Sequence, residues 1–495
     1  EEDTPMYMSA ASFEAEDAFA DVGYADGRRP RLIAPAGVND AASYALSEIE
    51  LERTLVTDRE HHARFDLARK LALLGADAEL KFGAKFSRRK KNSDQTTWKL
   101  EDFGDAPFNL ADAQLSLANY TGPAASYPWG AFGPTISPAA VRAVYAGMDL
   151  TPFIDDEEST INDFRMREDI DAAYVQAGFE TAGWRWLVGV RHEGTRFKAE
   201  GTGLVDGDFV AHRVDRSYGH WLPGVHVRRN LDEDTALRAA WTHSVVRPTF
   251  GQLAPGYVID GDEAEFGNPA LAALKSANFD LGIEKRLGYA GVVSAYVFHK
   301  RIRNFTYQTD LAGTGDWAAF DEAVTYANGD QARVTGLELA YTQTLGHLGG
   351  FWNGVILGAN ATFTHTRAGI ARWDADAGAM RSRDIPLPSQ SDRVFNLSIG
   401  YETPAFGVRL AANYKSRYLL EVADVLDADG DNYVDAQTQF DLSARYAVSK
   451  RLSLVFEALN LNDEPYYVYT GKASRNAQYE TYGRTYRLNL KYALY

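Results

Sequence analysis

The pattern with the clearest chemical meaning is the acidic segment at residues 427–435, which reads Asp-Ala-Asp-Gly-Asp-Asn-Tyr-Val-Asp. Its carboxylates belong to Asp427, Asp429, Asp431 and Asp435. Carboxylates at the first, third, fifth and ninth positions of a loop resemble a calcium site, because Ca²⁺ prefers roughly six to eight oxygen ligands. The segment departs from an EF-hand at Asn432, which replaces a glycine, and at Thr438, which replaces a bidentate glutamate. We expect either a structural Ca²⁺ that orders the loop or an acidic loop that stays solvated.

A second set of candidate binding residues is aromatic. Five Tyr and Trp side chains lie in segments that we expect to be loops, namely Tyr127, Trp129, Trp317, Trp373 and Tyr433. Exposed aromatic rings can stack on sugar rings or on the apolar faces of ligands. The alternative for each ring is that it packs one loop against another. The sequence therefore nominates these residues for ligand contact and leaves the structural role open.

Motifs of catalysis are absent from the sequence. It contains no Gly-rich phosphate loop, no His-Glu-x-x-His, no Gly-x-Ser-x-Gly and no cysteine. The adjacent His61 and His62 would point to opposite faces of a strand, so they cannot share a metal ion. The formal net charge of -17 repels the phosphate backbone of nucleic acids. We predict a protein that is not an enzyme, requires no cofactor and does not bind nucleic acid.

The elements that position these residues are predicted to be β-strands. Apolar and polar residues alternate over stretches of about ten residues, as in the segment 276–285, where Ala277, Phe279, Leu281 and Ile283 alternate with polar side chains. We count about sixteen such segments, each near the length that crosses a bilayer at a tilt. No run of about eighteen apolar residues is present for a membrane-spanning helix. The mean hydropathy of -0.33 does not exclude a transmembrane barrel, because half of each strand is polar, so it is neutral evidence.

The connections between these strands alternate between tight and long from residue 168 onward. Tight ones include 181–183 and 403–405, and long ones include about 198–217 and 304–331. Outer-membrane barrels have short periplasmic turns and long external loops, whereas a soluble sandwich follows no such rule. We predict an all-β, antiparallel transmembrane β-barrel of the outer-membrane type over 1–495. Its longest external loop, at about 91–167, is expected to carry local structure or to act as a lid.

Three stretches resemble the TonB-dependent receptor family, in particular the large receptors of Caulobacter- and Xanthomonas-type bacteria. The first runs from Arg247-Pro248-Thr249-Phe250 through Gly267-Asn268-Pro269 to the strand at 276–284. The second is Leu459-Asn460-Leu461-Asn462-Asp463-Glu464-Pro465-Tyr466, and the third is the closing strand Gly483-Arg484-Thr485-Tyr486-Arg487-Leu488. The prolines and glycines in them are turn chemistry, so these residues identify the family without performing its transport.

The resemblance implies a barrel of roughly 22 strands that is closed by an N-terminal plug domain. About sixteen strands are recognisable in this chain, so we expect the plug and the first strands to lie outside it. The implied function is TonB-energised uptake of a scarce solute across the bacterial outer membrane, an oligosaccharide first and an iron chelate second. The implied partners are outer-membrane lipid, the plug with the early strands, and the TonB-ExbB-ExbD system. The alternative is a passive porin of about sixteen strands.

Overall fold

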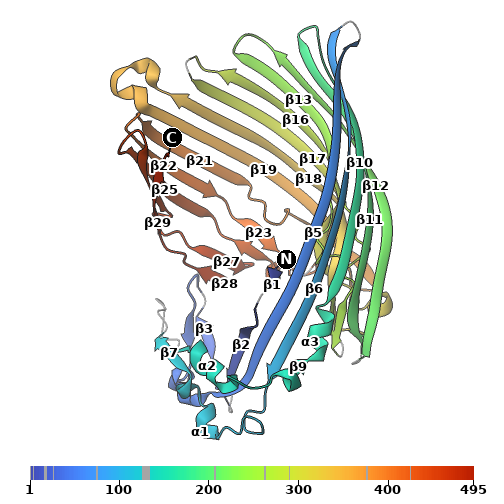
Figure 1. Ribbon diagram of the computed structural model, residues 1–495, viewed down its shortest axis with the longest axis vertical. Helices are drawn as coiled ribbons and strands as arrows, with labels where there is room; N and C mark the ends of the chain where they lie inside the picture. Colours follow the sequence, from blue (N-terminus) through green and yellow to red (C-terminus); the bar gives the residue numbers. More distant parts are fainter. Residues whose placement is uncertain are drawn as a thin grey trace.

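The computed structural model describes residues 2–3, 5–15, 19–25, 27–73, 76–124, 134–205, 208–260, 263–288, 290–374, 377–423 and 425–494. In this part of the chain, one large and mainly antiparallel sheet contains most of the residues (Figure 1). Its long strands pair in chain order: β2 (Tyr7–Glu14), β5 (Ala45–Leu73), β6 (Ala76–Leu100), β10 (Phe164–Thr181), β11 (Trp184–Val205), β12 (Asp208–Asn230), β13 (Thr235–Val246), β16 (Leu274–Arg286), β17 (Gly291–Asp310), β18 (Glu322–Thr344), β19 (Val355–Asp374), β21 (Arg393–Glu402), β22 (Phe406–Lys415), β25 (Gln437–Ala447), β26 (Leu452–Leu459) and β29 (Thr485–Tyr492). The prediction of about sixteen antiparallel strands is confirmed.

Shorter strands extend this sheet or form small sheets beside it. The five short members of the large sheet are β1 (Glu2–Asp3), β9 (Ile154–Asp155), β14 (Tyr257–Asp260), β15 (Glu263–Phe266) and β20 (Ala379–Ile385). The second sheet contains β23 (Tyr418–Glu421), β24 (Asn432–Val434), β27 (Tyr466–Thr470) and β28 (Asn476–Glu480), and we call it the loop sheet. Two hairpins complete the strands, β3 (Gly23–Ala25) with β4 (Arg31–Ile33) and β7 (Thr121–Ala124) with β8 (Pro134–Ile136).

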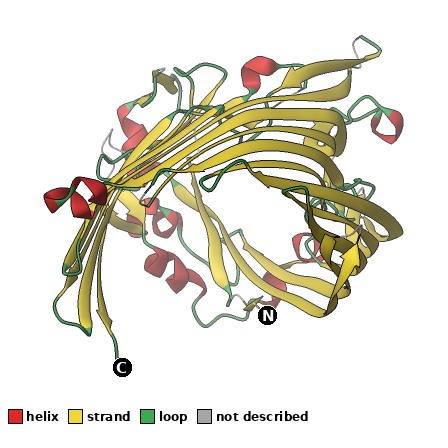
Figure 2. Cartoon of the chain, turned by 90° about the horizontal axis from the view of Figure 1, so that it is seen from above, coloured by secondary structure: helices red, strands yellow, loops and turns green. Residues whose placement is uncertain are grey.

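The large sheet curves without closing (Figure 2). Within the described residues, β29 pairs only with β26, and β2 pairs only with β5. The part of β5 from Thr57 to Leu73 pairs only with β6. A closed barrel satisfies every backbone N–H and C=O of its wall, whereas these two edges leave theirs without a strand partner. The sixteen strands therefore form an open arc of barrel wall.

The two faces of the sheet differ in chemistry as the alternation predicts. Segments that follow β13 and β22 pack on one face, which we call the inner face: Leu253 lies in a core with Met166 and Phe197, and Leu419 in a core with Ala368. The opposite, outer face exposes large apolar side chains to the surroundings. They include Phe65, Phe279, Leu281, Ile283, Val297, Leu339, Phe363, Leu397, Ile399, Leu410, Leu488 and Leu490. An apolar outer belt of this kind is what a membrane-spanning barrel wall requires.

The tight connections predicted at 181–183 and 403–405 are confirmed. β10 ends at Thr181 and β11 begins at Trp184, and β21 ends at Glu402 before β22 begins at Phe406. These turns gather at the upper end of the wall in Figure 1, and the helices α1–α3 and the longer connections lie at the lower end. No helix among the described residues has the length and apolar character needed to cross a membrane.

Several of the predicted long loops are shorter than the sequence suggested. The predicted loop at 198–217 is wrong, because β11 and β12 stay paired from Trp184–Arg229 to Val205–Asp208. Cross-strand charges such as Lys198 and Asp215, 2.7 Å apart, sustain this ladder where the apolar alternation has ended. Likewise β17 continues to Asp310 and β18 begins at Glu322, so their connection is confined to 311–321.

The longest connection runs from 101 to 163 rather than from 91 to 167. β6 continues through the basic run at 88–91, whose Arg89 forms an ion pair with Asp58 at 2.6 Å. The connection carries α1 (Asp112–Leu115), α2 (Pro138–Tyr145) and α3 (Asp156–Ile161). Part of it closes a core on the end of β5 and β6, made of Leu46, Ile49, Leu51, Leu100, Phe103, Tyr120 and Val141. This segment has local structure, which is one of the two expectations from its length.

Candidate functional site

The four aspartates of the calcium-like segment do not converge on one point. Asp431 is 1% exposed and accepts two hydrogen bonds from the Arg383 guanidinium, at 2.6 and 2.8 Å. Asp427 accepts the backbone N–H of Asp429, and Asp435 pairs with Arg28 at 3.3 Å. Among the described residues, no group of three or more His, Cys, Asp or Glu side chains is arranged to hold a metal ion. Calcium binding stays a prediction, and it would require Asp431 to leave Arg383.

The aromatic candidates have different surroundings. Tyr127 and Trp129 lie outside the described residues. Trp317 stacks on Phe266, with ring centroids 4.5 Å apart, and so holds one loop against another. Tyr433 stacks on Tyr469 in the loop sheet at 5.7 Å, and burial raises the pKa of its hydroxyl. These two contacts match the packing role that the sequence left open.

Trp373 is the aromatic candidate that borders a large cavity. The β17–β18 and β19–β20 hairpins separate beyond Ala368, the last residue of β19 that pairs with β18. A cavity of about 1300 Å³ lies between them, lined by Trp373 together with Arg303, Tyr307, Arg333, Arg367, Met380 and Asp384. Binding of a ligand there by Trp373 remains a prediction.

The inner face also carries an ionic cluster that the sequence does not predict. Arg247, which follows β13, donates to Glu193 at 2.7 Å and to the hydroxyl of Thr195 at 2.9 Å. Its Nε lies 3.9 Å from Glu168, and the three charged side chains are 17%, 13% and 13% exposed. Because these side chains are largely buried, their charge-assisted bonds are stronger than those of surface pairs. The cluster ties the segment after β13 to the wall and places fixed charge inside the arc.

Two unsatisfied side chains adjoin this cluster. His220 lies opposite Glu193 in the β11–β12 ladder and is 7% exposed, yet neither of its ring nitrogens has a hydrogen-bond partner among the described residues. Arg216 lies on the same strand, near the rings of Phe197 and Tyr218, and two of its nitrogens are also unbonded. Buried donors without partners are uncommon and indicate a polar group, a water or a partner surface that completes them. Their only signal in the sequence is a short run of polar side chains at alternate positions of β12, namely Arg216, Tyr218 and His220.

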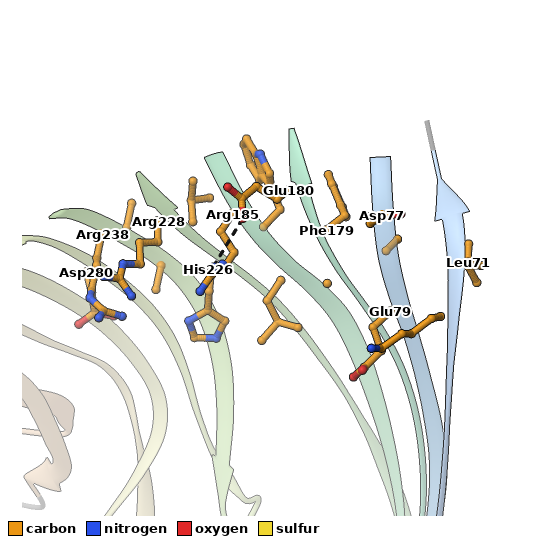
Figure 3. Close-up of a pocket in the computed structure, with 18 of the residues that line it drawn as sticks. Leu71, Asp77, Glu79, Phe179, Glu180, Arg185, His226, Arg228, Arg238 and Asp280 are labelled. Atoms are coloured by element: carbon orange, nitrogen blue, oxygen red, sulfur yellow. Dashed lines mark ion pairs between the residues drawn. The ribbon is translucent and has the colours of Figure 1, made fainter. Parts of the chain in front are cut away.

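A cavity lies on the inner face near the tight turns, and Figure 3 shows side chains that line it. It is about 1110 Å³ in volume and is lined by side chains from β5, β6, β10–β13, β16 and β17. Arg228 and Arg238 face each other across the β12–β13 ladder, and Arg238 pairs with Glu284 at 3.0 Å. Figure 3 also shows the ion pair of Glu180 with Arg185, at 3.5 Å. Charges of both signs in a wide hollow fit a protein surface or a polar solute better than an apolar ligand.

The comparison with protein families gives one extended match. The sequence matches the family model described as TonB dependent receptor-like, beta-barrel, over residues 11–461. No curated protein matches the sequence.

Solved structures of similar fold include receptors for iron chelates. The ferric-catecholate import receptor Fiu from E. coli K12 is 14% identical, with a TM-score of 0.58 over 92% of this chain and 57% of that chain. The siderophore receptor PiuA from Acinetobacter baumannii is 16% identical, with a TM-score of 0.57 over 94% and 59%. A variant of the ferric enterobactin receptor PfeA from Pseudomonas aeruginosa is 16% identical, with a TM-score of 0.53 over 91% and 60%. The chain therefore spans less than two thirds of the length of these receptors.

Proposed function

Because the chain belongs to the TonB-dependent receptor β-barrel family, a family of outer-membrane transporters rather than enzymes, we propose that it forms the wall of a receptor that takes up a scarce solute with energy from TonB. The observation that carries the proposal is the family match over 11–461. The outer apolar belt and the charged inner face agree with a wall between bilayer and polar lumen.

The proposal includes a plug domain inside the arc, through which the TonB-ExbB-ExbD system acts. Two observations support it: the solved receptors are much longer than this chain, and the inner face carries a wide, charged cavity near the tight turns. The nitrogens of His220 and Arg216 that lack a hydrogen-bond partner among the described residues offer further polar contacts to a domain or solute in the lumen.

For the substrate we propose an oligosaccharide first, from the resemblance to the large Caulobacter- and Xanthomonas-type receptors, and an iron chelate second. The solved receptors are named for ferric citrate, ferric catecholates, siderophores and enterobactin, and at 14–16% identity they support the fold rather than a ligand.

The test is an uptake assay in the native bacterium. Labelled oligosaccharides and ferric citrate or catecholate chelates are offered to the parent strain, to a strain without this receptor and to a strain without TonB. We expect uptake of one solute class at limiting concentration to fall to background in both mutants. Uptake that survives the loss of TonB, together with large salt-dependent conductance of the purified protein in planar bilayers, would establish the passive porin instead.

A further inference from the structure

A row of arginines crosses three neighbouring strands on the outer face. Arg301 of β17 lies opposite Arg333 of β18, and Arg333 lies opposite Arg367 of β19. All three are exposed, whereas the residues that alternate with them on β18 and β19 are buried toward the inner face: Ala332, Val334, Thr366 and Ala368. The side chains of the row therefore point away from the lumen, on the face that carries the apolar belt.

The height of this row follows from the ladder register. The last apolar rung on these strands is Val297–Leu337–Phe363, and the next rung is His299–Thr335–His365. The arginine row is the rung after that, toward the long connections. Two rungs span four residues, or about 13 Å along a strand. At the usual strand tilt this is about 10 Å along the membrane normal. The polar layer of one leaflet is about 5–8 Å thick, so the row lies at the head groups of the outer leaflet or at their upper edge.

The charge of the row is largely uncompensated. Arg367 forms an exposed ion pair with Asp384. Among the described residues, Arg301, Arg333 and the nearby Arg303 form no ion pair or side-chain hydrogen bond with a carboxylate, although the whole chain has a net charge of -17. Like charges directly opposite each other in a ladder are destabilising. A row of three arginines is therefore explained best by an anion that lies against it.

The cavity beside the row indicates what kind of anion fits. It is about 1300 Å³ in volume, and its lining joins Arg303, Arg333 and Arg367 to the apolar side chains of Trp373 and Met380, which lie opposite each other in the β19–β20 ladder. Guanidinium groups bind phosphate oxygens in a two-pronged geometry, and tryptophan favours the membrane–water interface. The combination suits a charged head group that is attached to a bulky, partly apolar body.

We propose that this surface is a binding site for a phosphate-bearing head group of an outer-leaflet glycolipid, held by Arg301, Arg333 and Arg367 with Arg303 at the cavity. The site faces the bilayer rather than the lumen, so it would serve anchoring and orientation of the receptor in the outer leaflet. It depends on the membrane location of the barrel and not on the solute that the receptor takes up.

The test measures glycolipid binding by the purified receptor. Detergent-solubilised wild-type protein and the triple variant Arg301→Gln, Arg333→Gln, Arg367→Gln are titrated with a bis-phosphorylated glycolipid and with its dephosphorylated form. Each arginine near an anionic surface contributes about five-fold in affinity, so the triple variant should bind the phosphorylated lipid about 100-fold more weakly. The dephosphorylated lipid should bind weakly to both proteins.

A matched variant separates a built site from general charge. Arg185→Gln, Arg213→Gln, Arg451→Gln also removes three exposed positive charges, but from scattered positions, and it should bind like the wild type. Equal weakening in both triple variants, or none in the first, would overturn the proposal. Displacement of the lipid by millimolar inorganic phosphate would also overturn it, because the surface would then be a site for free anions. Heat-modifiable migration in gels verifies that each variant is folded, and the readout is independent of uptake.

Discussion

Asp431→Asn is expected to open the loop sheet of β23, β24, β27 and β28 locally, at a cost of about 3–5 kcal/mol. Asp431 is 1% exposed, and its carboxylate receives both bonds of the Arg383 fork from β20. The substitution leaves the guanidinium, 19% exposed, without its charged partner. Removal of one member of a buried pair costs far more than removal of an exposed one, because the remaining charge is still desolvated.

Hydrogen exchange measured by mass spectrometry checks this result, because the opening is local. Peptides that cover β20 and β24 should lose protection by roughly a hundred-fold or more, while peptides from β11 and β17 stay protected. Asp384→Asn is the matched control: it breaks an Arg–Asp pair near the same β19–β20 hairpin whose side chains are 68% and 51% exposed, and it should change little. The same small change in both variants would contradict the buried pair.

Calcium binding can be tested with Asp431→Asn and one further variant, Arg383→Met. If the segment 427–435 binds Ca²⁺, Asp431 must exchange Arg383 for the ion. Arg383→Met should then bind calcium more tightly than the wild type, while Asp431→Asn should not bind it. If Arg383→Met does not bind calcium in isothermal titration, segment 427–435 is not a calcium site. In the wild type it is then an acidic loop held by Arg383.

The second large effect is expected at the middle of the apolar belt, from Leu410→Arg. Leu410 is 42% exposed on the outer face of β22, at the centre of the strand. An arginine at the bilayer midplane on the lipid face of a barrel costs about 2–4 kcal/mol. The neighbouring Ala411→Arg is the control, because Ala411 lies on the inner face opposite Asp441 and the new charge can find a partner there. Urea unfolding in lipid vesicles should show a loss of stability for Leu410→Arg alone. Equal losses would mean that the two faces are assigned wrongly.

The connections between strands include both correct and wrong predictions from the local sequence. The tight turns were predicted correctly, because Thr181-Ala182-Gly183 and similar segments carry their own turn chemistry, with Ala182 and Gly183 both at positive φ. The sequence predicts loops at the outer ends of β11 and β12, because the apolar alternation stops there. What maintains those ends is pairing between strands, such as Lys198 with Asp215, and a single segment contains no trace of its partner.

The candidate sites also include some that the sequence identified and one that it did not. The sequence identified Trp373 and the acidic segment as chemically distinctive, but it assigned Asp431 to a metal when the fold gives it to Arg383, 48 residues earlier. The inner cluster of Arg247, Glu168 and Glu193 was not recognised, because its members come from three elements and each looks like an ordinary polar residue of a strand or turn.

The sequence by itself determined the all-β class, the number of strands and the family, because alternation and turn residues are local properties that each segment carries alone. Only the tertiary structure decided that sixteen strands leave two open edges, and that Arg301, Arg333 and Arg367 form one row. The physical reason is that strand register brings together residues more than thirty positions apart, and a shift of one residue would turn every side chain of a strand to the other face.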